Sequence, residues 1–126
     1  MRPINGFLFV LATFAASAAA ADTSDSLAAR HQRAVATTEG AAYEKSVGQT
    51  VAEHYGSIQK CFPRRHTTLQ ITVFFEISPD GAVGASDALP QGTESSCALT
   101  QIRQLKFPAG APPDFVGKFN FVINGT

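Results

Sequence analysis

The chain has 126 residues, and its ten lysine and arginine residues balance ten aspartate and glutamate residues, so the formal net charge at pH 7 is zero. This balance excludes the strongly basic composition that is typical of proteins that bind nucleic acid or anionic membranes. The length corresponds to one small domain. Such a domain buries only about 60–70% of its unfolded surface and therefore gains from a covalent cross-link.

The first residues have the pattern of a secretory signal. Arg2 is followed by an uncharged apolar stretch from Gly6 to Phe14, and a run of small residues then ends at Ala21. A membrane-spanning helix needs about 20 predominantly apolar residues, whereas the strongly apolar part here stops near Phe14. We therefore expect residues 1–21 to be a cleaved signal peptide and the mature protein to be periplasmic or secreted.

Residues 22–42 are rich in alanine, threonine, serine and aspartate. Leu27 and Val35 are the apolar anchors of a loose helix that this segment could form. With so little apolar surface to bury, the segment is interpreted as a flexible leader, and whether it orders on binding a partner is left open. The folded domain is expected to span residues 43–126.

A helix is predicted from Tyr43 to Phe62. Its apolar residues recur every three or four positions and fall on one stripe: Val47, Val51, Tyr55, Ile58 and Phe62. Pro63 ends the helix. Arg64 and Arg65 follow, where positive charge compensates the negative end of the helix dipole. The same basic pair is a candidate contact for an anionic group of a partner.

The segment Thr67–Ile77 predicts a strand because apolar residues alternate onto one face: Leu69, Ile71, Val73, Phe75 and Ile77. Its other face is apolar enough to favour a central place in a sheet. The sequence Ser-Pro-Asp-Gly at 78–81 predicts a turn. A weaker strand, Ala82–Leu89, completes a hairpin.

A second helix is predicted over Thr93–Leu105, with Thr93 as its N-cap. Phe107 and Pro108 follow its end, and the last strand is predicted over Phe115–Ile123. The order is helix, strand, strand, helix, strand. We predict an α+β fold in which a three-stranded antiparallel sheet carries both helices on one face.

Cys61 and Cys97 lie in the two predicted helices and flank the hairpin. In an oxidising compartment such a pair favours a disulfide, which would stabilise the domain by roughly 4 kcal/mol in the chain-entropy model. Two alternatives remain open: Cys61 as a thiol nucleophile beside His54 or His66, and a zinc site made by the same cysteines and histidines. We expect neither, and the sequence indicates no catalytic residues, metal or cofactor.

Several motifs resemble those of a known family. Ile-Gln-Lys-Cys-Phe at 58–62 ends the first helix, Asp-Gly-Ala-Val at 80–83 follows the first strand, and Phe107-Pro108 follows the second helix. Over about residues 47–123 the chain resembles the C-terminal domain of TonB-type energy transducers, closest to the cysteine-containing AgmX/PglI variant. Lys106 stands where the family usually has an aromatic residue. No membrane helix and spacer of the usual kind precede the domain, so we expect the fold and its binding habit, rather than force transmission, to carry over.

The resemblance implies binding of an extended peptide or of a second protomer at a sheet edge. We therefore predict a non-enzymatic interaction module of the cell envelope, with a protein or peptide partner or a homodimer, and with no nucleic acid. The alternative is a small thiol-dependent enzyme or an inhibitor or immunity-type protein. The candidate partner-binding residues are Phe115, Lys118, Asn120, Val122, Arg64 and Arg65.

Overall fold

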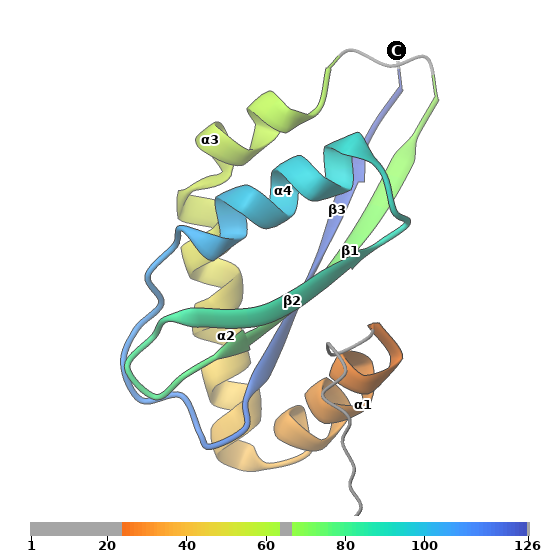
Figure 1. Cartoon of the computed structure of the whole chain (residues 1–126). Helices are drawn as coiled ribbons and strands as arrows, with labels where there is room; N and C mark the ends of the chain where they lie inside the picture. The colour runs from red at the N-terminus through yellow and green to blue at the C-terminus, as the bar shows by residue number, and fades with distance from the viewer. Residues whose placement is uncertain (1–23, 64–66, 126) are drawn as a thin grey trace, which may run out of the picture.

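The computed structural model describes residues 24–63 and 67–125 (Figure 1). Its helices and strands are α1 (Ser24–Val35), α2 (Thr38–Glu53), α3 (Tyr55–Ile58), the 3₁₀ turn η1 (Gln59–Cys61), β1 (Leu69–Ile77), β2 (Val83–Leu89), α4 (Thr93–Arg103) and β3 (Val116–Ile123). The predicted α+β class and the three-stranded antiparallel sheet are confirmed. Within the described ranges, no helix is both long enough and apolar enough to cross a membrane.

The sheet has the order β2-β1-β3, so the predicted central strand is central. β1 pairs with β2 through the hairpin and with β3 in a continuous register from Leu69↔Ile123 to Glu76↔Val116. The β1–β2 register shifts between Phe75 and Ile77. β2 and β3 are therefore the two edges of the sheet.

One face of the sheet packs against α2, α3, η1 and α4, and the main core lies between them (Figure 1). The alternation of β1 places Ile71, Val73 and Phe75 in this core, each with 0% exposure. The α2 stripe meets them through Val47 and Val51, which are equally buried. We call this side of the sheet the helix side.

The predicted helix over 43–62 is longer and less regular in the structure. α2 begins at Thr38, because the Thr37 hydroxyl accepts a hydrogen bond from the Gly40 N–H at 2.9 Å and caps the helix. α2 ends at Glu53, and α3 and η1 continue to Cys61. The domain thus begins before residue 43.

The predicted cap of the second helix is wrong. Gly92 holds the N-cap position of α4, and no side chain caps it, while Thr93 is the first helical residue. The hydroxyl of Ser95 is used elsewhere, since it donates to the Pro90 carbonyl at 2.5 Å. The start of α4 is therefore held by contacts to the preceding loop.

The segment expected to be a flexible leader forms α1, and α1 lies on the opposite face of the sheet (Figure 1). We call this face the α1 side. Leu27 is fully buried there in a small cluster with Phe74 and Val116. The expected arrangement of two helices on one face describes α2 and α4 but leaves out this third helix, because one buried leucine gives almost no helical periodicity to read.

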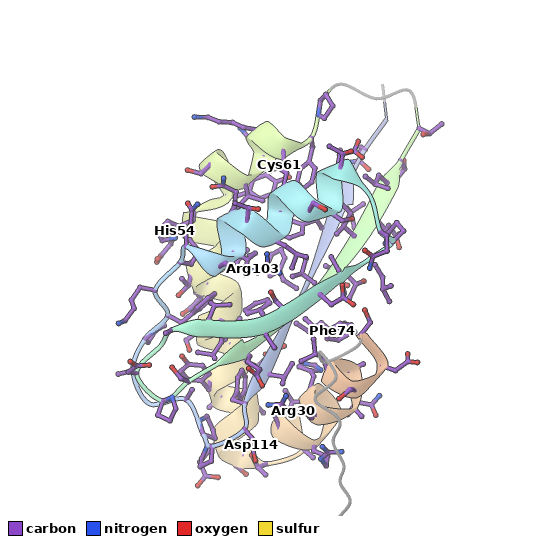
Figure 2. The ribbon with its side chains drawn as sticks, viewed as in Figure 1. Arg30, His54, Cys61, Phe74, Arg103 and Asp114 are labelled. Carbon is purple, nitrogen blue, oxygen red and sulfur yellow. A yellow bond between two sulfur atoms is a disulfide. The ribbon has the colours of Figure 1, made fainter. Side chains whose placement is uncertain are left out.

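The disulfide between Cys61 and Cys97 is confirmed, with an S–S distance of 2.00 Å and a Cα–Cα distance of 5.5 Å. It joins the end of η1 to the first turns of α4, as Figure 2 shows at Cys61. The bond cross-links two helices of the layer that packs on the β1–β2 hairpin.

Candidate functional site

The free edge of β3 is the candidate site, and the register shows which backbone groups face outward. The Ile77 N–H donates to the Phe115 carbonyl at 3.1 Å, which makes this a hydrogen-bonded pair. In an antiparallel ladder such pairs alternate with non-bonded ones. Lys118, Asn120 and Val122 therefore direct their N–H and C=O groups away from β1. No hydrogen bond from within residues 24–63 or 67–125 reaches these outward groups.

The β2 edge is partly closed by its own side chains. The same alternation places the N–H and C=O groups of Ala88 on the outer side of β2. The Ala88 N–H donates to Asp87 Oδ1 at 2.9 Å, and its carbonyl accepts from Gln91 Nε2 at 3.1 Å. Groups that are already paired cannot add a new strand. The β2 edge is therefore blocked at Ala88, whereas the outward groups of Ser86, two residues earlier, have no such partner among the described residues.

The charge state of Asp87 supports this closure. Desolvation by burial raises the pKa of Asp87, but hydrogen bonds from Ser24, Ala88 and Gln91 together outweigh it, so that the pKa is lowered overall. The carboxylate is thus ionised at neutral pH and remains an acceptor. Its second oxygen accepts from the Ser24 hydroxyl at 2.6 Å, which also ties the start of α1 to β2.

Three of the predicted contact residues share the α1 side of β3. Val122 is 53% exposed, and Asn120 accepts a hydrogen bond from the Thr72 hydroxyl at 2.7 Å through its side-chain oxygen. Lys118 is half-buried, with its Nζ 6.0 Å from the centre of the Phe74 ring. The structure brings these three residues together along the open edge.

The other predicted contacts do not join them. Phe115 is only 1% exposed and packs edge-on against Tyr43, with ring centres 4.9 Å apart. It precedes β3 and faces the helix side, so it is a core residue whose side chain is not accessible to a partner in this structure. Arg64 and Arg65 lie outside the described residues.

A group of aromatic rings, which was not predicted as a site from the sequence, borders the same edge on the helix side. Three rings surround Phe121: Phe119 at 4.7 Å, Phe62 at 5.8 Å and Tyr55 at 6.2 Å between ring centres. Phe121 is buried, whereas the other three remain partly exposed. We call these four residues the aromatic shelf. Tyr55 and Phe62 belong to the predicted helix stripe, and Phe119 and Phe121 to the predicted last strand, but local spacing does not show that the two elements bring these rings together.

The alternatives based on cysteine chemistry do not fit the structure. Both cysteines are used in the disulfide, so neither is free as a nucleophile or as a zinc ligand. His54 is exposed and its Nδ1 lies 2.9 Å from the Thr50 carbonyl oxygen. The part of the chain that the structure describes contains no group of three or more metal-ligating side chains.

A groove lined by both apolar and charged residues also lies between α1 and the loop at 110–114. Its charged lining residues are Arg30, Arg33, Glu39 and Asp114. Figure 2 shows Arg30 and Asp114 at this end of the molecule. Two cations and two anions favour no single class of charged ligand, so the groove gives a weaker basis for function than the β3 edge.

Comparison with known proteins adds no assignment, since no family model, curated protein or solved structure matches this chain.

Proposed function

We propose that this protein is a non-enzymatic interaction module of the cell envelope that binds an extended segment of another protein by strand addition to β3. The observation that carries the proposal is the longer free edge of β3: its outward groups at three alternate residues have no partners among the described residues, whereas on β2 Ala88 is paired by Asp87 and Gln91. Backbone pairing at an open edge is a common mode of peptide recognition.

The proposed location rests on two features that agree with each other. Residues 1–21 have the composition of a cleaved signal peptide, and the Cys61–Cys97 disulfide is compatible with an oxidising compartment. The helix–strand–strand–helix–strand order of residues 38–123 supports the proposed kinship with TonB-type C-terminal domains.

Replacing Asn120 by proline tests the function directly. The Asn120 N–H faces away from β1, so Asn120→Pro removes a donor from the free edge without removing a hydrogen bond of the sheet. We expect the variant to keep its disulfide and its circular dichroism spectrum. We also expect it to lose capture of envelope proteins in pull-downs, or self-association in solution, by tenfold or more.

Asn120→Ala is the matched control, because it removes the same side chain and keeps the N–H group. The control is expected to bind as the unmodified chain does. Equal binding by the proline variant and the alanine variant would contradict strand addition at β3.

A further inference from the structure

The side chains beside β3 restrict which peptides could use the proposed edge. In an added antiparallel strand, residues opposite Phe119 and Phe121 project to the helix side, and residues opposite Lys118, Asn120 and Val122 project to the α1 side. Successive residues of the peptide therefore meet two different surfaces in alternation. The two surfaces have different chemistry.

The helix side offers partly exposed aromatic rings. Phe119 belongs to β3 itself, and Tyr55 and Phe62 reach Phe121 from the helix layer with ring centres at 6.2 Å and 5.8 Å. A large aliphatic side chain on these rings removes apolar area of both partners from water. Two peptide residues that are separated by one other residue would lie over the aromatic shelf.

The α1 side of β3 offers a positive charge at Lys118, polar groups at Asn120 and an exposed apolar side chain at Val122. Lys118 is the single charged residue of β3, and it lies over the Phe74 ring at 6.0 Å. Within the described ranges no carboxylate forms an ion pair with it. Asn120 and its partner Thr72 continue this surface with an amide and a hydroxyl. A carboxylate directly opposite Lys118 would complement the charge.

We propose, resting on the function proposed above, that the peptide bound at β3 runs antiparallel to it and carries large aliphatic side chains at two alternate positions, opposite Phe119 and Phe121, followed by an acidic residue opposite Lys118. The partner is thus a segment of the type x–aliphatic–polar–aliphatic–acidic, in which x lies opposite the exposed Val122 and is not specified. Adjacent aliphatic residues do not satisfy this pattern, because one of the two would face the polar α1 side.

The probes are short synthetic peptides added to the purified full chain with its disulfide intact. The first is acetyl-Thr-Ile-Thr-Ile-Asp-amide. The second, acetyl-Thr-Thr-Ile-Ile-Asp-amide, has the same composition with adjacent isoleucines. Binding is followed by NMR from the amide shifts of Lys118, Asn120 and Val122. We expect the alternating peptide to bind about tenfold or more tightly than its isomer, since one isoleucine leaves the shelf.

Two N-methylated forms of the alternating peptide separate this inference from the function on which it rests. Methylation of the central threonine nitrogen blocks the hydrogen bond to Asn120 and is expected to abolish binding. Methylation of the second isoleucine nitrogen is expected to be tolerated, since that N–H points away from β3. If only the central methylation weakens binding but the two isomers bind equally, strand addition stands and the side-chain pattern is overturned.

Equal binding by both methylated forms would overturn strand addition itself, and no binding by the alternating peptide at millimolar concentration would overturn both proposals. The charge is tested separately by Lys118→Glu. We expect this variant to bind the alternating peptide about two- to fivefold more weakly, and to regain affinity when lysine replaces the peptide aspartate. Unchanged affinities in this exchange would overturn the acidic position.

Discussion

The two faces of the sheet are built in different ways. The helix side is a continuous apolar core closed by a disulfide, in which Phe75 and Phe107 stack with ring centres 5.5 Å apart. The α1 side has a small apolar cluster around Leu27, and polar bonds hold its helix at the sheet. The Arg30 guanidinium donates to the Glu76 carboxylate at 2.7 Å, and the Ser24 hydroxyl donates to the Asp87 carboxylate at 2.6 Å.

The two faces therefore contribute differently to folding stability and to the proposed recognition. The helix side excludes water from large side chains, and such burial is the main source of folding free energy. The α1 side leaves part of the sheet open, and both exposed large apolar residues, Leu89 at 44% and Val122 at 53%, face it. The proposed binding edge thus lies between a closely packed face of the sheet and a partly uncovered one.

The largest effect on stability is expected for two neighbouring residues of β1 that point to opposite faces of the sheet. Phe75 points to the helix side with 0% exposure, and Phe74 points to the α1 side with 7%. We expect Phe75→Ala to lower the free energy of unfolding by about 3–5 kcal/mol, because it leaves a cavity in the core. Phe74→Ala should cost roughly half as much. Urea denaturation measures both, and equal losses would remove the distinction between the faces.

Removing the disulfide tests what the cross-link, as distinct from core packing, contributes to the stability of the helix side. Replacing Cys61 and Cys97 together by alanine releases a cross-link that spans 36 positions. The free energy of unfolding should fall by up to about 4 kcal/mol, since the unfolded chain regains its loop entropy. Chemical denaturation of the double variant against the oxidised chain gives the value. A change below about 1 kcal/mol would show that the cross-link contributes little to this face.

On the α1 side, Leu27→Ala removes the single buried residue of α1. We expect a loss of about 2 kcal/mol, together with faster hydrogen exchange of the α1 amides than of the amides in α2 and α4. Gln32→Ala, at an exposed position of the same helix, should stay within about 0.5 kcal/mol. Uniform acceleration of exchange in all helices would mean that the two faces unfold as one unit.

The smallest effect concerns the ion pair that fastens α1. The hydrogen bond from Arg30 is the main cause of a lowered pKa for Glu76. A carboxyl whose pKa is lower in the folded state stabilises the protein above its ordinary pKa of about 4.3, and this contribution is lost as the pH falls through the folded value. For a partly exposed pair we expect about 0.5–1 kcal/mol.

Glu76→Gln should therefore be less stable than the unmodified chain at pH 7, and the two should converge at acidic pH. Thermal unfolding across this range measures the difference. Glu53→Gln, at an exposed position of α2, is the control and should show no such convergence. A constant difference between Glu76→Gln and the unmodified chain at every pH would assign the effect to packing rather than charge.

Much of the helix side was predictable because local backbone geometry converts spacing into faces. Alternation along 69–77 placed Phe75 in the core, and the stripe through Val47 and Val51 met it there. Two cysteines in helices flanking a hairpin were enough for the disulfide. Phe115 was predicted to contact a partner, and its packing against Tyr43, more than 70 positions earlier in the chain, could not be read from local spacing.

The sequence by itself determined the strands, the central place of β1 and the residues that can be buried, because these follow from periodicity along a short stretch. Only the tertiary structure decided that α1 covers the opposite face and that β3 keeps a longer open edge than β2. The first depends on contacts such as Arg30 with Glu76, between residues 46 positions apart. The second depends on the register, which sets whether the groups of Asn120 and Ala88 face a neighbouring strand or the outside.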